Sequence, residues 1–399
     1  MTTMLGIDVS KKTATVAVVT DLAVVTECHI TLDLLGFNKV KNLYNQHQAA
    51  TVIFESTGVY SRRLEAYLTQ NGLRYHILNP LVAKKRLDNG TRLRKNDQAD
   101  AQKLAQSEMM TKNIVIDQPK APVYSELADM SRFYYQLNED KKRTRNRIHR
   151  LIQLTFATFT DEFDLSTVNA LSILKHSPSS AMVTAIRDIN EIISNMKSWH
   201  LRGLGDFRAN QYARRLWRAA GRNQTAVPAS SHNVYQLQYQ IGQLEQLIQE
   251  QKQLILAMGK VAEELPEYQI IQSVPGIAES TTVRLIGELG DLRRFETSQQ
   301  INSYIGIDLT EIDSGDYQSA RHITKHGNPH ARRILYWTIV NQVSSVVPDN
   351  HIRDLYYKKR QSTSSKKKLI VCLMDHLIRT IFHLVKTNQA YSYEIAISG

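Results

Sequence analysis

The sequence of 399 residues predicts an α/β domain at the N-terminus and mostly helical structure after it. Two observations support this fold class, α/β plus α. Up to about residue 115, short apolar runs with strand-like alternation are interspersed with amphipathic stretches, which is typical of helices packed on a mixed sheet. Beyond that point apolar residues recur every three or four positions, which indicates helices, two of them long.

The N-terminal stretch predicts four strands and a helix before its most polar part. An apolar run from Met4 ends at Asp8, and the alternating residues 13–19 follow as a neighbouring strand with a buried face. The run 51–54 ends at Glu55. An amphipathic helix is expected over 60–70, before a short strand at 74–78.

Four acidic residues, Asp8, Glu55, Asp97 and Asp100, are candidates for a divalent-metal site. Asp97 and Asp100 lie three residues apart at the start of a predicted helix, so both carboxylates project from one face. Each acid alone is more often a cap or a turn former than a ligand. Their joint order is harder to reach by chance, and their oxygens suit Mg²⁺ or Mn²⁺. We therefore predict a metal site.

The net charge of +12 predicts a polyanionic partner. Nucleic acid is the first choice, and an anionic membrane surface is the competing one. No membrane partner is expected, because the apolar segment 369–385 is interrupted by charged residues and reads as a packing helix. Cys28 and Cys372 show no ligand spacing, and no secretory peptide is recognisable, so we expect a reducing cytoplasm.

A basic stretch leads directly into Asp97, and we expect it to bring a phosphate backbone to the acids. A solvated helix face is the equal alternative. The candidate nucleic-acid-binding residues in this stretch are Lys84, Lys85, Arg86, Arg94 and Lys95.

Two long helices are predicted in the middle of the chain, at about 124–158 and 234–265. Their apolar stripes predict an antiparallel or intermolecular coiled coil, and hence a homo-oligomer, a dimer or a tetramer. The insert at about 160–230 contains Trp199, Trp217 and a basic run, 214–218. We expect its tryptophans to be core residues, and the sequence suggests no role for the insert.

Two motifs mark the last region. Residues 273–277, followed by an apolar helix to Gly290, predict two helices joined by a Pro-Gly turn at Gly276. Such a hairpin can direct backbone N–H groups at a phosphate, although a plain helical hairpin would look the same. The pair Ser314-Gly315 lies in a polar loop, where it is most simply a turn. A cationic, glycine-punctuated segment follows, with Arg321, Lys325, Arg332 and Arg333 as candidate nucleic-acid-binding residues.

Together these motifs resemble the DEDD insertion-sequence transposases that carry a catalytic serine, the Piv/MooV-like group of IS one-ten and IS eleven-eleven transposases. The matching segments are 6–11, 55–60, 79–80, 95–101, 275–277, Phe295, Gly306, 314–315, 324–328 and 332–333. The resemblance implies three parts. These are a RuvC-like (ribonuclease H-like) domain at 1–115, a coiled-coil region at 116–265 with its helical insert, and a helical transposase domain at 266–399.

The resemblance also implies a chemistry. Asp8, Glu55, Asp97 and Asp100 would bind Mg²⁺ or Mn²⁺, and Ser314 would be the nucleophile of a DNA recombinase that is guided by a structured noncoding RNA. Two alternatives stay open. A RuvC-like junction nuclease would use water and keep Ser314 only as a turn. A non-catalytic nucleic-acid-binding assembly protein would use the acids as helix caps.

Overall fold

The computed structural model describes residues 2–78, 97–110, 121–199, 201–309, 313–314, 317–318, 322–362 and 365–398. The chain forms two compact units, Met1–Lys120 and Ala121–Gly399, and each is described by itself. The division into three parts at about 115 and 265 stays a prediction.

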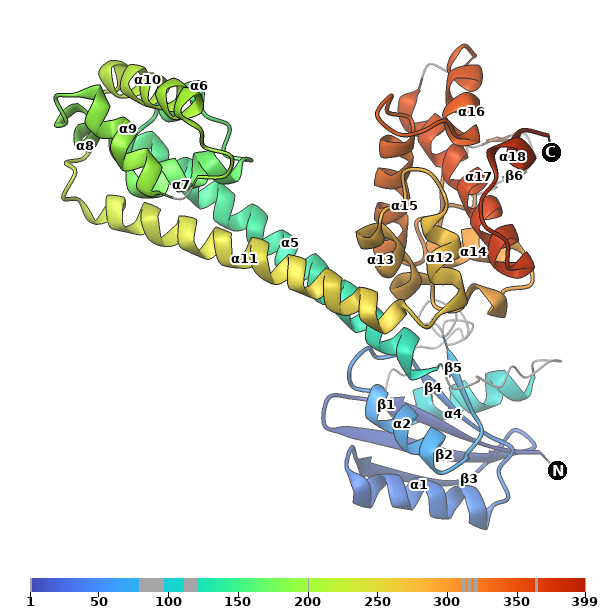
Figure 1. Cartoon of the computed structure of the whole chain (residues 1–399). Coiled ribbons are helices and arrows are strands. Elements are labelled where there is room, and N and C mark those ends of the chain that lie inside the picture. The colour runs from blue at the N-terminus through green and yellow to red at the C-terminus, as the bar shows by residue number, and fades with distance from the viewer. Residues whose placement is uncertain are drawn as a thin grey trace. The chain divides into compact units, whose positions relative to one another are not determined.

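The N-terminal unit is built on a mixed sheet, as the sequence predicts, and this sheet has five strands among the described residues (Figure 1). Its strands are β1 (Thr3–Val9), β2 (Thr13–Thr20), β3 (Ala23–Thr31), β4 (Thr51–Glu55) and β5 (Tyr75–Leu78). They lie in the order β3-β2-β1-β4-β5. The first three are antiparallel, whereas β4 runs parallel to β1, and β5 runs parallel to β4. The parallel strands β1 and β4 therefore end at the same edge of the sheet.

Helices cover both faces of this sheet. The helices α1 (Leu34–Gln46) and α2 (Arg62–Gln70) share a core with Leu5 and Ile7 of β1. On the other face α4 (Asp97–Met109) packs against the alternate residues of the strands, including Met4. Because side chains alternate along a strand, even-numbered residues of β1 face α4.

In the C-terminal unit two long helices, α5 (Pro122–Thr155) and α11 (His232–Ala262), lie side by side and antiparallel (Figure 1). Their bounds agree with the two long helices that the sequence predicts to within a few residues. Five shorter helices lie between them in the sequence. These helices form a separate core with the C-terminal end of α5 and the N-terminal end of α11. These are α6 (Phe159–Glu162), α7 (Val168–His176), α8 (Ser180–Thr184), α9 (Ile189–Ser198) and α10 (Asp206–Arg222).

The two tryptophans of this insert differ. The ring of Trp199 packs against the core and stacks on His176, with centroids 4.9 Å apart. Trp217 is 36% exposed, so the expectation of a core residue is wrong for it. Leu216 and Ala220 occupy the buried face of α10, and this leaves Trp217 on the outer face of the helix.

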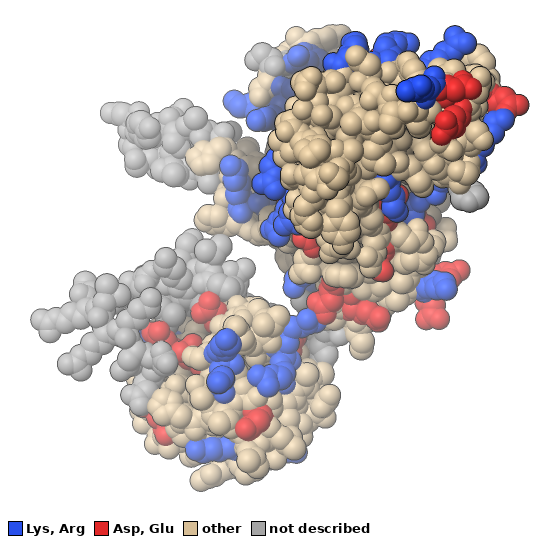
Figure 2. All heavy atoms as spheres, turned by 90° about the vertical axis from the view of Figure 1, so that its left-hand side faces the viewer, with Lys and Arg blue, Asp and Glu red and all other residues tan. Residues whose placement is uncertain are grey.

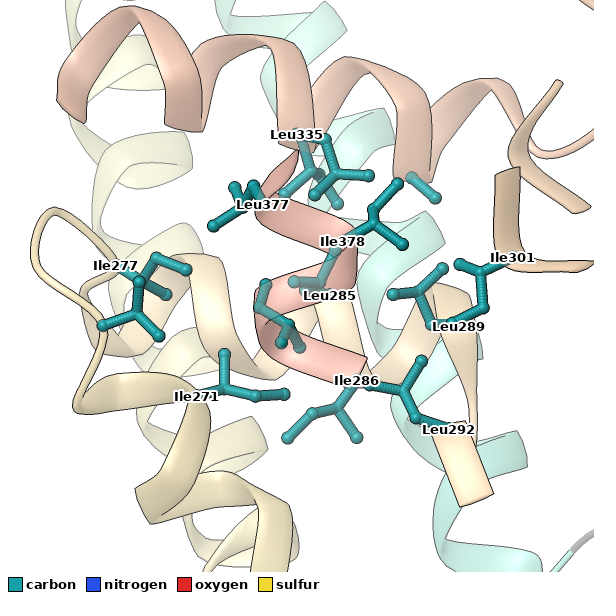
Figure 3. Packing of buried hydrophobic residues seen from close by; sticks show 14 of the residues in the cluster. Ile271, Ile277, Leu285, Ile286, Leu289, Leu292, Ile301, Leu335, Leu377 and Ile378 are labelled. Carbon is teal, nitrogen blue, oxygen red and sulfur yellow. The ribbon is translucent and has the colours of Figure 1, made fainter. Parts of the chain in front are cut away.

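The rest of the unit is a helical bundle around α17 (Lys366–Thr387). Figure 3 shows Leu377 and Ile378 of this helix between Leu335, Leu285 and Ile286. None of the helices that the structure describes has the length and apolarity of a membrane span. The other elements are α12 (Pro266–Gln272), α13 (Glu279–Leu289), η1 (Leu292–Arg294), α14 (Ser298–Ile305), β6 (Asp313–Ser314), β7 (Tyr317–Gln318), α15 (Pro329–Gln342), α16 (His351–Arg360) and α18 (Tyr393–Ser398).

Candidate functional site

Asp8 and Glu55 lie at the ends of the adjacent parallel strands β1 and β4. The register pairs Ile7 with Phe54, so Asp8 and Glu55 are the next residues along the two strands. Both are half-buried. Asp8 follows the alternation that places Met4 and Gly6 on the α4 face, and Glu55 follows Ile53, which also packs on that face. Their carboxylates therefore lie on the same side of the sheet as α4.

Close backbone packing places α4 on this face. A Cβ atom added to Gly6 would collide with the carbonyl oxygen of Ala101, so the helix lies directly on β1 at a position that only glycine permits. Asp100 precedes Ala101 and is half-buried. Burial raises the pKa of Glu55, and the negative charge of Asp100 raises it further. The structure thus brings the two carboxylates close enough to repel each other.

Asp8, Glu55 and Asp100 therefore lie on one side of the sheet. For the fourth predicted acid, Asp97, only the backbone is described. Asp97 is the first residue of α4, and its side chain lies outside the described residues. Among the described side chains no three His, Cys, Asp or Glu residues are grouped closely enough to hold a metal ion. The oxygen donors and the mutual repulsion of Glu55 and Asp100 suit a divalent cation. The metal site stays a prediction.

Ser314 belongs to a short antiparallel strand pair, in which it lies opposite Tyr317. Its backbone is described, but its side chain is not. Leu309 and Ile323 form an isolated bridge at the base of this segment. The N–H of Thr324 also donates to the carbonyl oxygen of Asp308 at 2.9 Å. The serine segment therefore leaves and rejoins the helical bundle at one point, between α14 and α15.

The predicted Pro-Gly turn is present between α12 and α13. Gly276 has a positive φ of 83°, which favours glycine. Side-chain amides of α15 hold the turn: Gln342 donates to the carbonyl oxygen of Pro275 at 2.8 Å, and Asn341 donates to that of Gly276 at 3.0 Å. These two hydrogen bonds hold the turn against the C-terminal end of α15.

The predicted cations differ in their environment. The guanidinium of Arg332 donates to the carbonyl oxygen of Ile305 at 2.5 Å, and burial lowers its pKa, so its contact is internal. Arg333 and Lys325 are exposed. The predicted cations that lie outside the described residues are Lys84, Lys85, Arg86, Arg94, Lys95 and Arg321.

The basic run of the insert is partly neutralised. Arg215, Arg218 and Arg222 lie 3.7, 3.5 and 3.4 Å from the carboxylate of Glu162, which is only 12% exposed. Figure 2 turns this end of the unit toward the viewer and shows Lys and Arg side chains along its upper edge. The ion pairs with Glu162 connect α10 to α6.

Sequence reasoning missed a cavity of about 340 Å³ between α5, α13 and α15. Its lining includes Arg284, Tyr135 and Trp337, together with Gly276 and Arg333. A signal for Arg284 exists in the sequence, because this arginine interrupts the otherwise apolar run from Val283 to Ile286. No local pattern marks Trp337.

Known proteins resemble the chain along its length. A Streptomyces coelicolor protein named as the transposase of the IS117 mini-circle is 23% identical over all of this chain and 97% of its own length. The transposase for the insertion sequence element IS1111A of Coxiella burnetii is 30% identical over 86 residues, which are 20% of this chain and 24% of that protein. Among solved structures, Thermus thermophilus RuvC in complex with a Holliday junction substrate covers 27% of this chain and 93% of its own at 12% identity, with a TM-score of 0.23.

Two family profiles match separate parts of the chain. A transposase family named for DEDD and IS110 matches residues 5–157, which contain all four predicted acids. The transposase IS116/IS110/IS902 family matches residues 268–357, which contain the Pro-Gly turn and the serine segment. The matches occur in the expected order and together span well over half of the sequence. The chain therefore belongs to the IS110/IS116/IS902 family of insertion-sequence transposases.

Proposed function

We propose that the protein cuts and rejoins DNA strands during transposition through a covalent link between Ser314 and a DNA phosphate. The observation that supports this most directly is the placement of Asp8, Glu55 and Asp100 on one side of the sheet. A family of transposases acts on DNA, and a net charge of +12 favours binding to its phosphates.

The acids would hold Mg²⁺ or Mn²⁺, with Asp97 as the fourth ligand. A bound ion would polarise the scissile phosphate and stabilise the oxygen that leaves. Without the ion, Asp100 raises the pKa of Glu55 by repulsion. The backbone positions of Asp8 and Glu55 are set by their strands, and that of Asp100 is set by the packing of α4 on Gly6. This rigid placement suits a site that must position a phosphate.

Ser314 would supply the nucleophile. Its Oγ attacks the phosphorus of the scissile phosphodiester and loses its proton to a base or to solvent. The bond from phosphorus to one DNA oxygen breaks, and that strand end leaves as an alcohol after it takes up a proton. The new serine phosphodiester conserves the energy of the broken bond. A second strand end can therefore attack it and rejoin DNA without a nucleotide cofactor.

Assembly and guidance are further parts of the proposal. The antiparallel pair of α5 and α11 would form a coiled coil that joins copies of the chain into a dimer or tetramer. A structured noncoding RNA would direct the protein to its DNA sites, as the family resemblance implies. Purification of the protein with its bound nucleic acid, followed by sequencing, tests the guide. RNA that maps beside the gene supports it, and only random cellular RNA contradicts it.

Trapping of a covalent adduct tests the serine. Wild-type protein with Mg²⁺ and DNA should yield a protein–DNA species that survives denaturation, whereas Ser314→Ala should yield none and still bind DNA. Ser303→Ala, at an exposed serine of α14, is the matched control and should form the adduct. A normal adduct with Ser314→Ala would exclude this serine. Mg²⁺-dependent cleavage without any adduct would favour the junction nuclease that uses water.

Removal of one acid tests the metal site separately. Asp8→Asn should stop strand cleavage in Mg²⁺ while circular dichroism and DNA binding are retained. Undiminished cleavage by this variant would refute the assignment of Asp8. A protein that neither cleaves nor responds to Mg²⁺ in any form would instead be a non-catalytic assembly protein.

A further inference from the structure

The cavity between α5, α13 and α15 has the chemistry of a nucleotide site. It is lined by two arginines, Arg284 and Arg333, and by aromatic residues on two of its walls. Its lining contains no Asp or Glu among the described residues. Its volume of about 340 Å³ lies within the range of sites for small molecules. All of these elements belong to the C-terminal unit.

Arg284 is the central feature of the cavity. Its Nε donates to the carbonyl oxygen of Ser280 at 2.6 Å, and its guanidinium lies 4.4 Å from the ring centre of Tyr134. Burial lowers the pKa of this guanidinium, and the neighbouring charge of Arg333 lowers it further. No described carboxylate forms an ion pair with it. A cation in this position is costly unless an anion is bound beside it.

Among the described residues, the one carboxylate that favours the positive charge of Arg284 is engaged elsewhere. Glu288 raises the pKa of Arg284, but it lies beyond ion-pair distance. Its oxygens accept hydrogen bonds from Ser131 and Asn328, each at 2.8 Å. Arg284 lines the cavity, and Glu288 does not neutralise its guanidinium through an ion pair.

The second cation is held at the cavity wall by an aromatic ring. The guanidinium of Arg333 lies 5.2 Å from the ring centre of Tyr135 and 3.5 Å from the carboxylate of Glu139. Glu139 does not line the cavity, so its ion pair with Arg333 lies outside the cavity. The ring of Tyr135 contacts His330 edge-on, at 4.6 Å between centroids. These contacts hold the side chains of Arg333 and Tyr135 in place before a ligand binds.

Trp337 supplies an aromatic surface beside the two cations. It lies on α15 one turn after Arg333, lines the cavity, and is 60% exposed. A large aromatic side chain that is exposed next to arginines can stack on a base, since every base has a π-face. The rings of Trp337 and Tyr336 form a T-shaped pair, with 5.7 Å between their centroids.

We propose that this cavity binds one unpaired nucleotide that is turned out of a nucleic-acid strand. The phosphate lies between Arg284 and Arg333, and the base stacks on Trp337. The inference rests on the proposed function and adds to it a means of recognising strands that are unpaired during recombination. The cost of unstacking is smallest for a nucleotide that has no partner, so such sites are selected over paired DNA.

Binding of three matched duplexes to the full-length protein tests the proposal. One duplex is fully paired, one contains a single unpaired adenine nucleotide, and one contains an abasic nucleotide at that place. The wild-type protein should bind the adenine duplex about tenfold more tightly than the paired one, and the abasic duplex should lose most of this preference. A neutral methylphosphonate beside the unpaired adenine should also remove the preference. The same set made of RNA shows which type of strand is preferred.

Variants assign the effect to the cavity. Trp337→Ala and Arg284→Gln should each reduce the preference for the unpaired adenine to about twofold or less. The matched controls are Trp217→Ala on α10 and Arg379→Gln on α17, which remove an exposed tryptophan and an exposed arginine outside the cavity. Both controls should keep the wild-type preference.

The outcomes separate this inference from the proposed function. Equal binding of the adenine and abasic duplexes, together with normal formation of the serine adduct, would overturn the nucleotide site and leave the recombinase intact. A preference that survives Trp337→Ala and Arg284→Gln would also overturn it. Failure to bind any of the duplexes would overturn both.

Discussion

Glu55 ends β4 with a half-buried side chain, and the charge of Asp100 adds to the effect of burial in raising its pKa. Two carboxylates in this arrangement destabilise the folded protein when both are ionised. A divalent cation between them would turn that repulsion into attraction. The effect of removing one charge should therefore change sign when Mg²⁺ is added.

Asp100→Asn tests this reversal. In the absence of metal, the loss of repulsion should raise the free energy of unfolding by about 0.5 kcal/mol, a small gain because both groups are partly exposed. In saturating Mg²⁺ the wild-type protein should become the more stable of the two, by about 1–3 kcal/mol. Thermal unfolding with and without Mg²⁺ measures both effects. Asp21→Asn is the control in the same unit. If Mg²⁺ stabilised Asp100→Asn as much as the wild-type protein, the metal site would be contradicted.

The two sites differ in how far the sequence could predict them. Asp8, Glu55 and Asp100 follow from local patterns, because strand ends and helix starts place side chains predictably. The convergence of Arg284 and Trp337 has no local signal, since the cavity forms only when three helices pack that are far apart in the sequence. The environment of Arg332 was also beyond prediction: a cation in a basic segment can donate inward as well as outward.

At the scale of elements, the docking of α4 on β1 decides where Asp100 lies. Gly6→Ala should disturb this contact, because the new methyl group would meet the backbone of Ala101. We expect a loss of about 1–3 kcal/mol in the free energy of unfolding, and a loss of stabilisation by Mg²⁺. Gly242→Ala, where an added Cβ meets nothing within 4 Å, is the control. Unchanged stability of Gly6→Ala would show that α4 does not pack on β1 in this way.

The packing of α16 on α17 predicts a pH dependence. His351 is buried, and its ring nitrogens contact the hydroxyls of Tyr391 at 2.9 Å and Thr380 at 3.0 Å. Burial, followed by the charge of His376, lowers the pKa of His351 below its ordinary value of 6.5. The unfolded chain therefore binds a proton more readily than the folded one. Stability that is full above pH 6.5 is lost as the pH falls below it.

His351→Gln should make this loss less steep. Each histidine proton contributes at most about 1.4 kcal/mol per pH unit, and the pKa of His376 is lowered too, so part of the dependence should remain. Urea denaturation between pH 7.5 and pH 5 measures the slope. His383→Gln, at an exposed position of α17, should leave it as in the wild type. A variant His351→Gln with an unchanged slope would place the titrating groups elsewhere.

At the scale of the whole molecule, the sequence predicted the order of elements better than their packing. The mixed sheet, the two long helices and the Pro-Gly turn follow from periodicity and turn residues. The small helices α6–α10 build a separate core on the end of α5 and α11, and this core depends on contacts between residues far apart in the sequence. The exposure of Trp217 could not be predicted from the sequence, because it depends on which face of α10 packs against the neighbouring helices.

The net charge of +12 makes the last prediction a property of the entire chain. If binding to DNA neutralises about 6–10 phosphates, affinity should fall by about 10³–10⁵ between about 50 and 200 mM salt, because condensed counterions are released. Arg333→Gln should make the logarithmic slope less steep by about 1, since one phosphate contact is lost. Arg379 does not line the cavity and is paired with Asp375 at 2.6 Å, so Arg379→Gln should leave the slope as it is. Fluorescence anisotropy with the duplex that contains the unpaired adenine nucleotide measures these slopes. A slope near zero would mean that the excess of positive charge does not meet phosphates, and anionic vesicles would then be the ligand to test.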